Sequence, residues 1–84
     1  MTTLDEERIK IITEAYGHRQ REVMHHQINI DNYTRAIAEI EANHTDKAHM
    51  VEFLERLRDL LASSIVEQDK ERVLLKVIGE QLEG

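Results

Sequence analysis

A turn signal at the midpoint of the 84-residue chain constrains its fold more than any other feature. The segment Glu41-Ala42-Asn43-His44-Thr45-Asp46 separates two halves of nearly equal length, and the chain contains no proline that would break either half. Asn43 suits the left-handed position that follows a helix, and Thr45 or Asp46 can accept backbone N–H bonds at the start of the next helix. The sequence therefore predicts two antiparallel helices joined by a short turn.

Each half carries an apolar repeat of the coiled-coil type, in which residues of one stripe are spaced alternately three and four apart. The first stripe consists of Ile9, Ile12, Tyr16, Arg19, Val23, His26, Ile30, Tyr33, Ile37 and Ile40. The second consists of Met50, Leu54, Leu57, Leu61, Ser64, Gln68, Glu71, Leu75, Ile78 and Leu82. We expect an all-α helical hairpin in one domain, residues 1–84, with a helix over about 3–42, a turn at about 43–45 and a helix over about 46–82.

Three local features bear on where these helices begin and break. Thr3-Leu4-Asp5-Glu6 has the form of a capping box that starts the first helix. Asn29-Ile30-Asp31-Asn32 contains side chains that compete for backbone hydrogen bonds, and Ala62-Ser63-Ser64 interrupts the second apolar stripe. We expect continuous helices, with a kink near 29–32 and a break near 62–64 as the alternatives.

A turn centred near residue 44 aligns the two stripes. It places Ile30 opposite Leu57 and Val23 opposite Ile65, so apolar positions meet apolar positions. The polar exceptions also fall together, with the arginine level with Gln68 and two carboxylates and the histidine level with the two serines. Paired polar groups in an apolar seam can fix register and orientation at some cost in stability. We therefore expect a specificity layer made of Arg19, His26, Asp69 and Glu71.

The second half has more apolar residues than one stripe needs. The additional surface consists of Ile65, Val66, Val73, Leu74 and Val77. A helix in a hairpin offers one stripe to its partner, so an additional apolar surface must be covered by another chain. We expect a homo-oligomer, with a dimer that forms an antiparallel four-helix bundle favoured over higher oligomers.

Composition excludes several classes of protein. The chain has no cysteine, which removes disulfides and thiolate metal sites, and its net charge of −6 is spread along the sequence without a basic stripe for nucleic acid. No apolar run approaches the roughly 20 residues that cross a bilayer. The acidic N-terminal segment lacks the features of a signal peptide. We expect a cytoplasmic protein that binds neither membranes nor nucleic acid.

Glu22 and His25 form a Glu-x-x-His pattern, which carboxylate-bridged di-iron bundles use on two of their four helices. Such a site also needs carboxylates on the facing helix, whereas the expected register places Val66, Ile65 and Ser63 there. We therefore expect a solvated helix face and no cofactor, and a ferritin-like metal-binding bundle that uses Glu22 and His25 is the alternative.

No residue set forms a catalytic motif. Ser63 and Ser64 are the only serines and lack a nucleophile-elbow sequence, and the three glycines are isolated. The sequence predicts a non-enzymatic protein that acts by helix-to-helix contact on an unidentified protein partner, as an adaptor, assembly factor or inhibitor. In being short, acidic, cysteine-free and helical it is similar to small accessory proteins of tailed phages and to secretion chaperones. A second alternative is a nucleic-acid-binding regulator that resembles the plasmid-encoded RNA-binding hairpin dimers.

Overall fold

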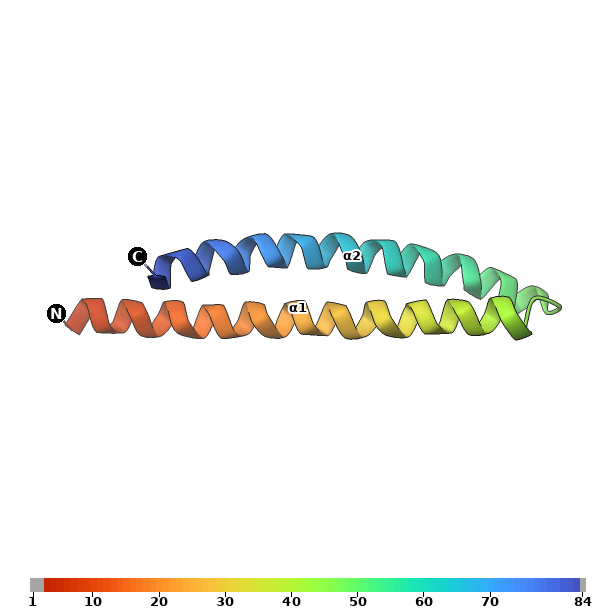
Figure 1. Ribbon diagram of the computed structural model, residues 1–84, viewed down its shortest axis with the longest axis horizontal. Helices are drawn as coiled ribbons and strands as arrows, with labels where there is room; N and C mark the ends of the chain where they lie inside the picture. The colour runs from red at the N-terminus through yellow and green to blue at the C-terminus, as the bar shows by residue number, and fades with distance from the viewer. Residues whose placement is uncertain (1–2, 84) are drawn as a thin grey trace.

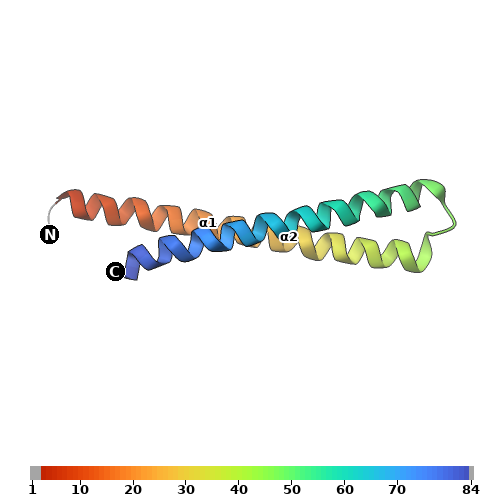
Figure 2. The same cartoon turned by 90° about the horizontal axis from the view of Figure 1, so that it is seen from above.

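Two antiparallel α-helices make up the part of the chain that the computed structural model describes, residues 3–83 with the side chains of residues 5–83. Helix α1 spans Thr3–Asn43 and helix α2 spans Ala48–Glu83. They form a rod of 66 × 15 × 14 Å (Figure 1), and they cross near the middle when the rod is seen from above (Figure 2). The predicted all-α helical hairpin is confirmed. Within the described range, neither helix combines the length and apolarity that a membrane span requires.

Both helices are continuous over the segments where the sequence left a kink or a break open. Residues 29–32 are helical within the 41 residues of α1, and residues 62–64 are helical within the 36 residues of α2. Packing along the seam therefore overrides the local preference of the asparagine and serine side chains for other conformations. The capping box expected at Thr3 involves a side chain outside the described ones.

The connection between the helices begins one residue later and ends two residues later than expected. The His44 N–H donates to the Ile40 carbonyl at 2.9 Å, and the Lys47 N–H donates to the His44 carbonyl at 3.3 Å, so residues 44–47 form the turn. The left-handed conformation predicted for Asn43 is wrong, because Asn43 is the last residue of α1 and no described non-glycine residue has a positive φ. The N–H of His44 instead continues the helical pattern for one more bond.

Lys47 occupies the cap position of α2, where the sequence suggested Thr45 or Asp46. The backbone N–H groups of Met50 and Val51 donate to the Lys47 carbonyl at 3.0 and 3.1 Å. A lysine side chain has no acceptor for the unpaired N–H groups of the first turn, and its charge opposes the helix dipole. The first turn of α2 contains no acidic residue that would compensate. The start of α2 is therefore a weak point of the fold.

The buried core lies close to the turn. Ile40, Leu54 and Leu57 are the buried apolar residues of the described chain, and Tyr33, Ala36, Ile37 and Met50 pack against them. Toward the open end, by contrast, the apolar stripe residues of both helices are at most half-buried. The core therefore holds one half of the rod more tightly than the other.

A different residue of α2 contacts Val23 than the one expected. The Val23 carbonyl accepts a hydrogen bond from Gln68, three residues further along α2 than the expected Ile65, which is exposed. Ile9 and Leu82, both assigned to the stripes, are exposed as well. They lie at the open end, where α1 extends beyond α2 (Figure 1) and each has neighbours on one side only.

Replacement of Leu57 by alanine should lower the free energy of unfolding by roughly 2–4 kcal/mol, because the side chain is 3% exposed and its loss leaves a cavity. Leu82→Ala is the matched control, since that side chain is 38% exposed and its loss should cost less than about 1 kcal/mol. Urea denaturation at one fixed protein concentration measures both values. Equal losses would contradict a core located at the turn.

Lys47→Asp should raise the free energy of unfolding by about 1 kcal/mol, because it supplies an acceptor and a favourable charge at the start of α2. Lys47→Ala, which removes the charge without adding an acceptor, is the control and should give a smaller gain. Thermal melts at low ionic strength compare the two variants. A Lys47→Asp variant no more stable than Lys47→Ala would place the cap elsewhere.

Candidate interaction surface

An ion pair joins the helices in the half of the seam that lacks the core. Nη1 of Arg19 donates to both carboxylate oxygens of Glu71, at 2.9 Å each. The two side chains are 33% and 17% exposed, so the pair is partly withdrawn from water. A partly desolvated arginine and carboxylate are costly when separated, and each therefore requires the other at this level. The contact is the arginine–carboxylate pairing expected from the stripes.

Gln68 adds a second polar contact across the seam. It is 6% exposed, and its Nε2 donates to the Val23 carbonyl at 3.1 Å and to Oε1 of Gln27 at 3.0 Å. The amide therefore has partners on α1 for its donor group, as a buried polar group requires. Sequence reasoning placed Gln68 in the stripe but did not assign it to the specificity layer. Its position in an otherwise apolar repeat was the available indication.

The other two residues of the expected specificity layer are not part of this network. Asp69 is exposed. His26 is half-buried, and its ring lies 6.0 Å from that of His25 at an interplanar angle of 40°. The hydrogen bonds of the described residues do not include one from His26 to Ser63 or Ser64. The polar layer of the seam thus consists of Arg19, Gln27, Gln68 and Glu71.

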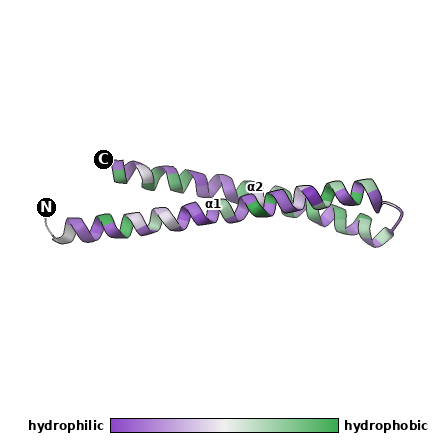
Figure 3. Ribbon diagram, turned by 60° about the horizontal axis from the view of Figure 1, so that its bottom comes forward, coloured by the Kyte–Doolittle hydropathy of each residue, from purple (hydrophilic) through white to green (hydrophobic). Residues whose placement is uncertain are grey.

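The additional apolar surface expected on α2 is exposed to solvent in the single chain. Its five residues are between 43% and 63% exposed: Ile65, Val66, Val73, Leu74 and Val77. Figure 3 shows hydrophobic positions along the length of α2, whereas the connection between the helices is hydrophilic. Apolar side chains at this exposure retain about half of the free energy that burial would release, which is roughly 1.5–3 kcal/mol for each complete burial.

The whole hairpin exposes more surface than a compact protein of its mass. Its accessible surface is 6423 Å² for 9.9 kDa, whereas a compact monomer of that mass exposes about 5,200 Å². The excess of about 1,200 Å² exceeds the roughly 800 Å² that each partner contributes to an interface of standard size. The rod therefore has enough surplus surface for a stable contact with another chain.

Further large apolar residues are exposed that sequence reasoning did not assign to a surface. They are Ile11, Met24 and Ile28 on α1 and Val51 and Phe53 on α2. Val51 is 39% exposed. The exposed residues of α1 are separated by polar and charged positions.

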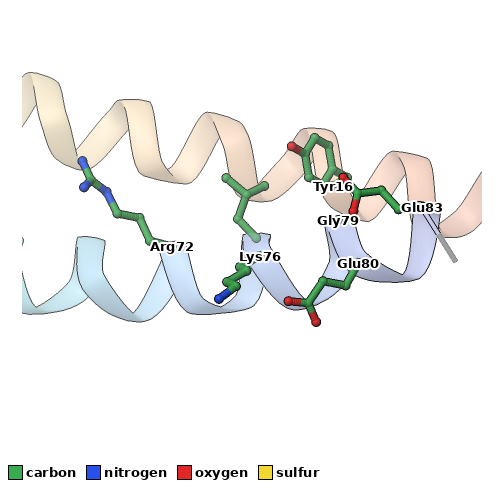
Figure 4. A pocket seen from close by; sticks show the side chains of 7 residues that line it. Tyr16, Arg72, Lys76, Gly79, Glu80 and Glu83 are labelled. Atoms are coloured by element: carbon green, nitrogen blue, oxygen red, sulfur yellow. The ribbon is translucent and has the colours of Figure 1, made fainter.

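A shallow groove of about 440 Å³ lies between the helices near the open end. Figure 4 shows Tyr16 of α1 beside Gly79 of α2, with Arg72 extending toward α1 and Lys76 and Glu80 pointing away from it. A Cβ atom at position 79 would lie 3.2 Å from Cε2 of Tyr16. Gly79 therefore allows the tyrosine ring to pack closely against the α2 backbone. The groove is a feature of helix packing.

The structure does not bring the two metal candidates together with further ligands. Glu22 is half-buried and His25 is exposed. Among the described residues, no group of three or more histidine, cysteine, aspartate or glutamate side chains could hold a metal ion. A ferritin-like site requires several carboxylates and histidines that converge from facing helices. The single hairpin therefore gives the Glu-x-x-His pattern no such partners.

The chain was compared with protein-family models, with curated proteins and with solved structures, and none of the three comparisons gave a match.

Arg19→Leu combined with Glu71→Leu should be at least as stable as either single variant, because each single variant leaves one partly desolvated charge unpaired. The double-mutant cycle should give a coupling of about 1 kcal/mol or more. The matched control is the cycle for Arg58 and Glu41, an ion pair at 3.0 Å whose side chains are 55% and 51% exposed. Its coupling should be below about 0.5 kcal/mol. Similar couplings in the two cycles would mean that Arg19 and Glu71 are fully hydrated.

Proposed function

We propose that this protein is a non-enzymatic helical interaction protein that self-associates and acts by helix-to-helix contact, as an adaptor, assembly factor or inhibitor. The observation that carries the proposal is the apolar surface of α2. Val66, Val73, Leu74 and Val77 are exposed in the single chain on one flank of a helix whose seam stripe already packs against α1, and Ile65 is exposed on the other flank. An exposed apolar surface of this kind marks a site of contact with another protein.

The shape of the hairpin supports the same proposal. A rod 66 Å long presents a long helix face rather than a concave site, and its chemistry suits the recognition of other helices. Charged residues make up 33% of the chain and cover much of the remaining surface. The exposed valines and leucine of α2 lie within this charged surface and therefore determine where an interface can form. The absence of cysteine fits a cytoplasmic location.

Sedimentation equilibrium at micromolar concentration should give a mass about twice that of the 9.9 kDa chain, because the surplus surface suffices for one standard interface. Val73→Asp should raise the dissociation constant at least tenfold, since a buried unpaired carboxylate costs more than the roughly 1.4 kcal/mol that tenfold represents. Val51→Asp, the same change beside the turn, should leave the mass unchanged. Circular dichroism checks that both variants stay helical.

A monomer at high micromolar concentration would contradict self-association. A dimer that is insensitive to Val73→Asp but is lost in Val51→Asp would move the interface away from the surface of α2.

A further inference from the structure

A second stripe runs along α2 beside the exposed valines. Its positions are spaced alternately three and four apart, as in the stripe that faces α1. They are Phe53, Arg56, Leu60, Ser63, Glu67, Lys70, Leu74, Val77 and Gln81. All are exposed except Leu60, which is half-buried. We name this set the outer stripe of α2; it is about 42 Å long at 1.5 Å per residue.

The outer stripe is apolar toward both ends and charged at its centre. Phe53 and Leu60 lie toward the turn, and Leu74 and Val77 lie toward the C-terminal end. Between them, Nζ of Lys70 lies 3.0 Å from Oε1 of Glu67, and these side chains are 65% and 48% exposed. A stripe with this pattern can be complementary to itself only if each charge of one copy meets the opposite charge of the other.

We infer that the outer stripe binds the outer stripe of a second copy of this chain in antiparallel orientation, about a two-fold axis between Gln68 and Asp69. This inference rests on the self-association proposed above and names its interface. In this register Glu67 faces the partner's Lys70, and Lys70 faces the partner's Glu67. Leu60 then faces the partner's Val77. On one flank of the seam, Val66 lies beside the partner's Val73.

Other arrangements of the same two stripes are less favourable. A parallel pair places Glu67 against the partner's Glu67 and Lys70 against the partner's Lys70, and like charges in contact are destabilising. An antiparallel pair shifted by one heptad in one direction places Glu67 on the partner's Val77. The shift in the other direction places Leu60 on the partner's Lys70. Among these arrangements, only the unshifted antiparallel one pairs Glu67 with Lys70, and it also places Leu60 on Val77 and Ser63 on Leu74.

The opposite flank of α2 is more densely charged. Val51 and Ile65 are exposed there, but Arg58 and Arg72 alternate with them at seven-residue spacing. Arg58 is also engaged with Glu41 of the same chain. With Glu55, Asp69 and Lys76 this flank carries five charged residues, whereas the outer stripe carries three. A two-fold contact through the outer stripe has the isologous form of most homodimers, in which one surface patch serves both copies.

Charge reversal tests the register. Glu67→Lys alone should raise the dissociation constant of the homodimer at least tenfold, because it places two lysines of each copy against two lysines of the other. Lys70→Glu should raise the dissociation constant similarly, because it places two glutamates of each copy against two glutamates of the other. An equimolar mixture of the two variants should form a heterodimer as tight as the wild-type dimer, since every contact is then between opposite charges. Native mass spectrometry with one variant labelled with ¹⁵N identifies the heterodimer.

Matched controls use the same charge changes away from the outer stripe. Glu55→Lys and Lys76→Glu are exposed positions of α2 outside that stripe, and they should leave the homodimer intact. The double variant Glu67→Lys with Lys70→Glu keeps the complementarity and should dimerise like the wild type. Circular dichroism checks that each variant remains helical.

These experiments distinguish a failure of the proposed interface from a failure of self-association itself. A wild-type dimer with single variants that dissociate and a mixture that recovers the dimer supports the antiparallel register. Single variants that dimerise like the wild type, or a mixture that stays monomeric, overturn the register and leave self-association in place. A monomeric wild-type chain overturns both proposals.

Discussion

Two helices share one seam, and this geometric limit governs the rest of the hairpin. A helix can bury only the stripe that faces its neighbour, so a two-helix rod cannot enclose a core on all sides. Among the residues whose side chains are described, the seam buries three apolar ones, all near the turn, and the chain leaves 6423 Å² exposed. The small core and the exposed valines of α2 therefore have the same cause.

Polar contacts fix the register of the two helices, which apolar contacts alone do not. A seam of leucines alone tolerates a shift by one heptad, because each leucine finds an equivalent position after the shift. The pair of Arg19 with Glu71 and the amide of Gln68 have no equivalent partners one heptad away. Their partial burial costs desolvation free energy, but it permits only one alignment of α1 with α2. In the proposed contact between two copies, Glu67 and Lys70 have the corresponding role.

The sequence predicted the features that depend on periodicity and missed those that depend on local geometry. Spacing alone was sufficient for two long helices and for the level of Arg19. It did not place the turn correctly, because helix ends depend on which backbone N–H groups find an acceptor. The cap of α2 is Lys47, whereas the sequence suggested Thr45 or Asp46. It also assigned Ile9 to the seam, because the spacing of apolar residues does not show that a residue at the end of a rod has fewer neighbours to pack against. The burial of Gln68 could not be predicted from the sequence, because a glutamine at a stripe position can either point into the seam or extend to solvent at its edge.

The position of the core implies an order of folding. Ile40 and Leu54 flank the turn, so a short loop closes when they meet, whereas Arg19 and Glu71 are separated by 52 residues. Closing a short loop costs less chain entropy than closing a long one. The hairpin should therefore zip from the turn toward its ends, and opening should proceed in reverse. Amide protons near both termini would exchange first, those around the Arg19–Glu71 pair next, and those of the turn-proximal core last.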